Sequence, residues 1–329
     1  MRLKLVPDQT SYDFFRYWKV TFGASILAMI LSLALFFVQG LNLGIDFLGG
    51  TTIRTESSTP VDVGAYRAAI APLGLGDVAI TEVFDPTFGP EQNVASIKIQ
   101  GQKGEESVSP EVIAAVGEAL LAADPNMVLP FPSVESVGPE VSAELVTSAL
   151  TAVGLAILAV LAYIWARFEW QFSLGAVAAL VHDVVLTIGI FSLLQIQFDL
   201  SIIAALLTIV GYSLNDTVVV FDRVRENLRK YKKPPLKEVL SISINETLSR
   251  TVMTSVTTLL ALVSLYVLGG DVIRGFVFAM IWGVIVGTYS SVFVASAILL
   301  YLGVARDTGS TGANGKGGPA GTQFANIDA

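Results

Sequence analysis

The chain has 329 residues, of which 53% are hydrophobic and 15% are charged, and its mean hydropathy is +0.66. In soluble domains about a quarter of the residues are charged, so this composition predicts a polytopic membrane protein. The net charge of −8 says little about partners, because the charges lie in separate regions, and we expect no nucleic-acid partner. The absence of cysteine excludes disulfides and thiolate chemistry, and the single histidine, His182, argues against an all-histidine metal site, so we expect no metal and no cofactor.

Residues 1–39 are predicted to form a polar N-terminal segment and the first membrane span, at about residues 20–38. An apolar run of this length crosses about 30 Å of hydrocarbon as a helix. Aromatic residues before the span form an interfacial belt that ends at Trp18. No cleaved signal is predicted, because the apolar run is long and has no clear small-residue cleavage site before Gln39.

Residues 40–140 have the composition of a soluble domain, with many acidic and few basic side chains. The pattern predicts, in order, a strand at 51–56, a helix at 61–73, strands at 77–84 and 93–100, a helix at 109–124 and an extended segment at 127–137. This β-α-β-β-α-β order is the split βαβ, or ferredoxin-like, arrangement. Such a domain commonly serves as a rigid docking head, and it contains no catalytic constellation.

Residues 141–304 are predicted to add five spans, at about 142–165, 172–194, 200–221, 248–268 and 275–303. Short connections make consecutive helices antiparallel neighbours. The fourth and fifth spans are predicted to be joined by a basic loop, residues 222–247, which Pro234-Pro235 interrupts and which contains a short amphipathic helix at 236–244. The fold class is therefore a polytopic α-helical membrane protein with six transmembrane helices and an α+β ferredoxin-like extracytoplasmic domain between the first two.

The distribution of charge predicts the orientation of the chain. Most Lys and Arg residues lie in the N-terminal segment, the 222–247 loop and the C-terminus, whereas the head is acidic. Both termini are therefore expected to be cytoplasmic and the head extracytoplasmic. Residues 305–329, rich in Gly, Ser, Thr and Ala, are predicted to form a disordered cytoplasmic tail.

The run Gly211-Tyr212-Ser213-Leu214-Asn215-Asp216 places a carboxylate inside an apolar span. An ionisable residue within a span is a functional-site candidate. The rise of about 1.5 Å per residue puts Asp216 and Arg250, on the next span, at comparable depth. Because arginine does not release its proton under ordinary conditions, Asp216 is the group expected to titrate, ionised beside Arg250 and protonated when the helices separate.

Several neighbouring residues are candidate supports for this relay. Four residues have hydroxyl or amide groups that we expect to bond to the Asp216 carboxylate or to line a water path. They are Asn215, Ser213, Thr217 and Thr254. Asp183, next to His182 in the third span, is either a second relay site or a packing contact satisfied by a neighbouring hydroxyl. Asp216 and Arg250 have a structural alternative as well, a buried ion pair that only sets helix register.

Two other classes of function compete with a proton relay. An intramembrane aspartyl protease would use Asp183 and Asp216 as a carboxylate pair, but the sequence before Asp216 lacks the Gly-x-Gly-Asp turn of those enzymes. A non-transporting assembly subunit would only clamp partners, and it differs from the relay in whether Asp216 titrates during the working cycle. No phosphate-binding loop supports an ATPase.

Motifs along the chain resemble, in the same order, those of the SecF family of bacterial protein export. The first is Gly44-Ile45-Asp46-Phe47-Leu48-Gly49-Gly50-Thr51 at the start of the head. The others are Val181-His182-Asp183-Val184, Val210-Gly211-Tyr212-Ser213-Leu214-Asn215-Asp216-Thr217, Phe221-Asp222-Arg223-Val224-Arg225-Glu226-Asn227 and Asn245-Glu246-Thr247-Leu248-Ser249-Arg250-Thr251. The resemblance covers about residues 14–303, and the wider resistance-nodulation-division (RND) transporters are related.

The resemblance implies a non-enzymatic subunit in the bacterial inner membrane, with a periplasmic head. SecF proteins pair with SecD, here a separate chain, associate with the SecYEG channel and often YajC, and use the proton-motive force to assist late steps of preprotein translocation. The proton-carrying aspartate of the family falls on Asp216, and its functional arginine falls on Arg250.

Overall fold

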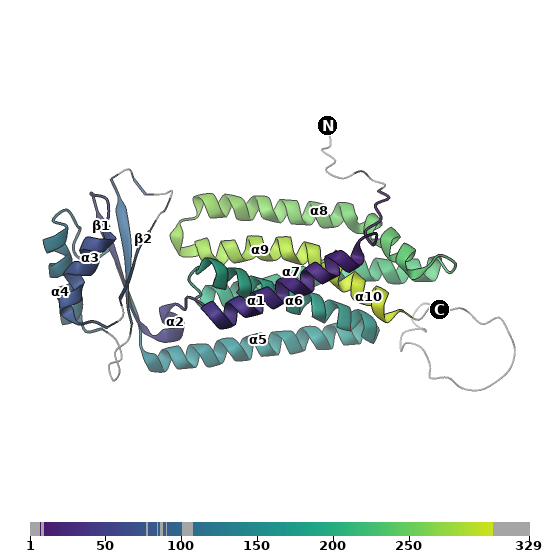
Figure 1. Cartoon of the computed structure of the whole chain (residues 1–329), viewed down its shortest axis with the longest axis horizontal. Helices are drawn as coiled ribbons and strands as arrows, with labels where there is room; N and C mark the ends of the chain where they lie inside the picture. The colour runs from purple at the N-terminus through teal and green to yellow at the C-terminus, as the bar shows by residue number, and fades with distance from the viewer. Residues whose placement is uncertain are drawn as a thin grey trace.

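The membrane bundle and the head lie end to end (Figure 1). A computed structural model of the chain describes residues 7, 10–76, 78–83, 85, 88–89, 91–100 and 108–304. The predicted disordered tail, 305–329, lies outside the described residues. The start of the first span and the end of the last one lie at the end of the bundle away from the head (Figure 1).

Six helical segments among the described residues are long and apolar enough to cross a membrane, which confirms the predicted number of spans. They are α1 (Trp18–Gln39), α5 (Pro139–Arg167), α6 (Trp170–Leu194), α7 (Leu200–Lys230), α8 (Leu236–Leu268) and a last span composed of α9 (Arg274–Ser290), the π-helical turn η3 (Ser291–Ala295) and α10 (Ser296–Leu302). Most predicted ends agree to within a few residues.

The connection between α7 and α8 is the exception, and the predicted basic loop at 222–247 is wrong. Only residues 231–235 connect the two helices, and the predicted short amphipathic helix is the first part of α8. The charged residues after Phe221 stay helical because Arg223 pairs with Glu226 at 2.6 Å and with Glu246 of α8 at 2.7 Å. The helical structure is interrupted at Pro234 and Pro235, and Pro235 lies immediately before α8. Proline ends a helix that precedes it, because it has no N–H to donate and its ring clashes with the preceding turn.

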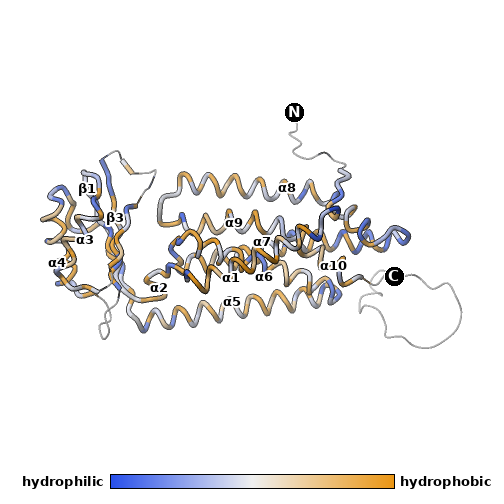
Figure 2. The backbone as a smooth tube through the Cα atoms, in the orientation of Figure 1, coloured by the Kyte–Doolittle hydropathy of each residue, from blue (hydrophilic) through white to orange (hydrophobic). Residues whose placement is uncertain are grey.

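The bundle has an inner and an outer set of helices. Buried residues are concentrated in α6, α7 and the last span, where Phe172, Phe221 and Ala295 are fully buried. Helices α1, α5 and α8 instead present apolar side chains outward. Figure 2 shows that hydrophobic residues recur along the helices of the bundle. An outward apolar face on a spanning helix is suited to lipid or to another bundle.

The head contains a four-stranded antiparallel sheet with two helices, and its elements follow the predicted order. They are β1 (Gly50–Ser57), α3 (Val63–Ile70) with the turn η1 (Ala71–Leu73), β2 (Val78–Val83), β3 (Asn93–Gln100), α4 (Pro110–Ala123) and β4 (Ser133–Val137). The strand order is β2-β3-β1-β4. Local signals set the helix starts: Ser109 accepts from the Val112 N–H as the N-cap of α4, and Asp62 accepts from the Ala65 N–H as the N-cap of α3.

The core of the head lies between the sheet and its helices. Ile53 and Ile97 pair across β1 and β3 and are fully buried, as is Leu120 of α4. At its edge, the Tyr66 hydroxyl donates to Asp124 at 2.9 Å, and burial, together with this neighbouring carboxylate, raises the pKa of Tyr66. Burial alone would raise the pKa of Asp124, but hydrogen bonds from Ser57, Tyr66 and other donors outweigh it and lower that pKa.

The junction between head and bundle ties the Gly-rich motif to the start of α7. The Gly44 N–H donates to the Phe198 carbonyl at 2.8 Å, and the Phe198 N–H donates to the Asn42 carbonyl at 2.8 Å. In the short helix α2 (Ile45–Leu48), Asp46 accepts from the Leu200 N–H at 3.0 Å, at the first residue of α7. Gly49 and Gly50 follow, with φ of 71° and 131°, which glycine adopts without strain. Thus β1 of the head is connected through one short segment to the helix that carries Asp216.

Candidate functional site

Asp216 lies in the middle of α7 with its carboxylate enclosed by protein hydroxyls. It is 7% exposed, although it is an acidic residue in an apolar span. Thr251 of α8 donates to Oδ1 at 2.6 Å, and Ser291 of η3 donates to Oδ2 at 2.7 Å. Short hydroxyl-to-carboxylate bonds of this kind offset part of the cost of burying a charge. One carboxylate therefore links three helices.

Asp183 of α6 forms a second buried carboxylate site. It is 1% exposed, and its Oδ2 accepts from Ser213 of α7 at 2.6 Å and from Ser290 of α9 at 2.8 Å. Its Oδ1 lies 3.0 Å from Nδ1 of His182. Asp183 is thus fully satisfied by neighbours from three helices, as expected for either of the two roles that its sequence position suggested.

Two consecutive serines connect the carboxylates. Ser290 bonds to Asp183 and Ser291 bonds to Asp216, because successive residues of a helix project about 100° apart and so face different neighbours. Ser291 is also the first residue of the π-helical turn, and Ser296 donates to its carbonyl at 3.2 Å. Single π-turns within helices occur frequently at functional sites.

Glycines allow the last span to approach α7 at this level. A methyl group on Gly287 would lie 3.1 Å from Cβ of Ser213, and one on Gly283 would collide with the Ile209 side chain. The two glycines are four residues apart, a small-xxx-small spacing that allows close helix packing. The serine pair reaches the two carboxylates only because the backbones lie this close.

Arg250 does not bind Asp216 directly in this arrangement. Its side chain is exposed on α8, and in the described part of the chain no hydrogen bond or ion pair within 4.0 Å joins it to the carboxylate, although its charge acts on Asp216 electrostatically. The hydroxyl of its neighbour Thr251 donates to the Asp216 carboxylate instead. The predicted Asp216–Arg250 pairing stays a prediction.

The other predicted support residues lie in different places. Ser213 bonds to Asp183 rather than to Asp216. Asn215 and Thr254 are exposed, and the Thr254 hydroxyl donates to the carbonyls of Arg250 and Thr251. Thr217 is buried, but no hydrogen bond from its side chain to either carboxylate occurs among the described residues.

Sequence reasoning missed Thr251, Ser290 and Ser291 as ligands of the carboxylates. A hydroxyl residue within a span is common, so its identity alone was no signal. The position of Thr251 directly after Arg250 was the nearest available indication.

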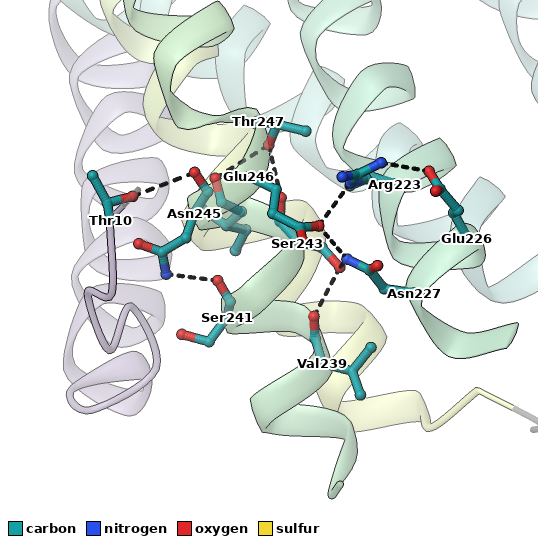
Figure 3. Close-up of polar contacts among 11 residues, drawn as sticks. Thr10, Arg223, Glu226, Asn227, Val239, Ser241, Ser243, Asn245, Glu246 and Thr247 are labelled. Atoms are coloured by element: carbon teal, nitrogen blue, oxygen red, sulfur yellow. Dashed lines mark hydrogen bonds and ion pairs between the residues drawn. The ribbon is translucent and has the colours of Figure 1, made fainter. Parts of the chain in front are cut away.

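A second polar cluster holds the ends of α7 and α8 together (Figure 3). Asn227 donates to Ser243 at 3.0 Å and to Glu246 at 2.6 Å, beside the Arg223–Glu246 ion pair. The segment before α1 is attached to the same part of α8, since Asn245 accepts from the Tyr12 N–H and donates to the Tyr12 carbonyl. These contacts fix α8 four to eight residues before Arg250 and Thr251. In the parts of the chain that the structure describes, no group of three or more His, Asp or Glu residues is arranged to hold a metal.

Comparisons with known proteins agree with one another. The family model "Protein export membrane protein SecD/SecF, C-terminal" matches residues 118–305, which include both carboxylates, and the model "SecD/SecF GG Motif" matches residues 34–61, which include the junction. The "Protein translocase subunit SecF" of Cereibacter sphaeroides is 60% identical over 100% of this chain and 99% of its own length. The protein of the same name from Rickettsia felis is 40% identical over 90% of this chain and 94% of its own length.

A solved structure has the same fold. The crystal structure of SecDF, a translocon-associated membrane protein from Thermus thermophilus, is 35% identical to this chain with a TM-score of 0.80. The match covers 92% of this chain and 40% of the SecDF chain, so this chain spans about two fifths of that longer protein.

Proposed function

Since the chain belongs to the SecD/SecF family of protein export membrane proteins, as a SecF-type translocase subunit, we propose that it uses the proton-motive force to assist late steps of preprotein translocation. It is a multi-pass protein of the inner membrane and, like its SecF relatives, not an enzyme. The observation that carries the proposal is the Asp216 carboxylate, buried within the bundle and held by hydroxyls from two other helices.

Asp216 is the proposed proton carrier. An ionised carboxylate accepts at both oxygens, as Asp216 does from Thr251 and Ser291, whereas a protonated one carries an O–H donor on one of them. The Ser291 hydroxyl has a second acceptor, the Thr288 carbonyl at 3.1 Å, so it can turn away and accept from a protonated Asp216. Proton uptake would then change the contact between α7 and the π-helical turn.

Arg250 is proposed to replace Thr251 as the partner of Asp216 in another state of the cycle. The two residues are neighbours on α8, so exchanging them requires α8 to turn by about 100°. Arg250 directly precedes Thr251, whose hydroxyl already donates to the Asp216 carboxylate, and this adjacency supports the exchange. A guanidinium at the carboxylate would keep Asp216 ionised, and its withdrawal would allow proton uptake.

Asp183 is proposed as a second proton-carrying residue of the same relay. Ser213, on the same helix as Asp216 and three residues before it, and Ser290, adjacent to Ser291, both bond to Asp183. Any movement of α7 or of the last span that alters the bonds of one carboxylate therefore alters those of the other.

In the proposed orientation both termini lie in the cytoplasm and the head lies in the periplasm. We propose a ferredoxin-like fold for the head from the order of its elements. The basic residues at the end of the bundle away from the head support this orientation.

The proposed partners are SecD as a separate chain, the SecYEG channel, YajC and the preprotein. The outward apolar faces of α1, α5 and α8 and the partial coverage of the longer SecDF chain support a second bundle as partner.

The test uses Asp216→Asn in vesicles that contain the complete translocation complex. Asp216→Asn should abolish the stimulation of translocation by a proton gradient while the chain still assembles with SecD. Asp222→Asn is the matched control, because it makes the same change six residues along α7 at a half-exposed side chain, and it should retain stimulation. Full stimulation in Asp216→Asn would refute the carrier role and favour a non-transporting assembly subunit.

A further inference from the structure

A basic cavity lies between the last turn of α5 and the end of α7, at the end of the bundle away from the head. Its volume is about 770 Å³, within the range of small-ligand sites. Ala166 and Arg167 of α5 form one wall, and Arg225, Arg229 and Lys230 of α7 are among the residues that form the other. We call it the rim pocket.

The acidic residues of the rim pocket are already paired. Asp222 forms an ion pair with Arg167 at 3.1 Å, and Glu226 forms one with Arg223 at 2.6 Å. Among the described residues, no carboxylate lies within ion-pair distance of the remaining cations, Arg225, Arg229 and Lys230. The rim pocket therefore presents three cations whose charge is not neutralised by the chain itself.

Two of these cations are arranged for an anion. Arg225 and Arg229 are four residues apart on one helix, so their side chains are neighbours and repel each other unless an anion lies between them. Arg225 is held in place by the Phe168 ring, 5.6 Å from its guanidinium carbon, and by a hydrogen bond to the Arg167 carbonyl. A pre-positioned guanidinium fork matches the geometry of a phosphate group.

The surroundings of the rim pocket indicate a membrane lipid. Trp165 and Trp170, on either side of the α5–α6 turn, are 76% and 57% exposed, as is typical of aromatic side chains at the level of lipid headgroups. Helix α5 exposes apolar residues along its length, which suits an acyl chain lying beside it. We propose that the rim pocket binds the phosphate of an anionic phospholipid, with Arg225 and Arg229 as its principal ligands.

The experiment measures lipid binding to the full chain in mild detergent by native mass spectrometry. Phosphatidylglycerol should bind at least tenfold more tightly than phosphatidylcholine. Each cation near an anionic lipid contributes about a fivefold change in affinity, so Arg225→Gln with Arg229→Gln should weaken phosphatidylglycerol binding roughly 25-fold. Lys233→Gln with Lys237→Gln, the same charge change at exposed residues that do not line the rim pocket, should change it less than about twofold.

If the double variant folds poorly, Arg229→Gln alone still tests the proposal, because Arg229 is exposed and its replacement should not disturb folding. The single variant should weaken phosphatidylglycerol binding about fivefold. An equal loss in the two double variants would mean diffuse attraction rather than a site, and would overturn the proposal. Equal affinity for the two lipids would overturn it as well. So would tighter binding of a glutamate-rich peptide than of phosphatidylglycerol, since the rim pocket would then be a protein-docking site.

Discussion

Replacement of Thr251 by valine tests whether its hydroxyl holds Asp216. Valine keeps the branched shape of threonine and removes only the hydroxyl, which donates to Oδ1 of Asp216 at 2.6 Å. Thr251 is 3% exposed and Asp216 is 7% exposed, so water has little access to replace the lost bond. The change therefore isolates one bond of the candidate relay.

The expected magnitude follows from the depth and charge of this bond. Hydrogen bonds to charged groups contribute about 1.5–3 kcal/mol in soluble proteins. Inside membranes, interhelical hydrogen bonds average about 0.6 kcal/mol and reach about 1.7, because the unfolded chain also finds partners there. For a short, buried bond to a carboxylate we expect a coupling energy at the upper end of the membrane range, about 1–2 kcal/mol.

A double-mutant cycle of Thr251→Val with Asp216→Ala measures this coupling energy from unfolding of the full chain in mixed micelles. Thr254→Val with Asp216→Ala is the matched control, because the exposed Thr254 hydroxyl donates only to backbone carbonyls. Its coupling should be below about 0.5 kcal/mol, the usual limit for sites that share no partner. A Thr251 coupling no larger than the Thr254 value would refute the conclusion that Thr251 holds the carboxylate.

Three further predictions concern packing, the junction and the head. Gly283→Ala should destabilise the bundle by about 1–3 kcal/mol in micelle unfolding because the methyl group meets Ile209, whereas Gly154→Ala, where nothing lies within 4 Å, should not. Asp46→Ala should remove a capping interaction of about 1 kcal/mol, so hydrogen exchange in the first turn of α7 should accelerate about fivefold while the middle of α7 is unchanged; equal rates in wild type and variant would contradict this. The lowered pKa of Asp124 stabilises the head above the unfolded-state value near 4, and this contribution is lost as pH falls through the folded-state pKa. Proteolysis of the head should therefore increase on acidification toward pH 2, and Asp124→Asn should weaken that dependence.

Local sequence determined the elements of this protein. A run of about 20 apolar residues predicts a span wherever it occurs, and alternation, caps and turn residues predicted the order of the head elements because each of these signals acts over a few residues. Asp216 and Asp183 were identifiable for the same reason, since a carboxylate within an apolar run is visible without knowledge of any neighbour. The basic loop at 222–247 was mispredicted because the bonds that keep it helical join Arg223 and Asn227 of α7 to Glu246 of α8.

The tertiary structure decided which groups hold the two carboxylates. Thr251, Ser290 and Ser291 are ordinary hydroxyl residues of apolar spans, and what distinguishes them is the direction in which each faces. That direction depends on the close approach of α7 and α9 at Gly287 and on the π-helical turn that begins at Ser291. Helix packing places hydroxyls from distant parts of the chain around one carboxylate. The spacing of residues along a single helix does not predict these contacts, because they depend on how neighbouring helices pack.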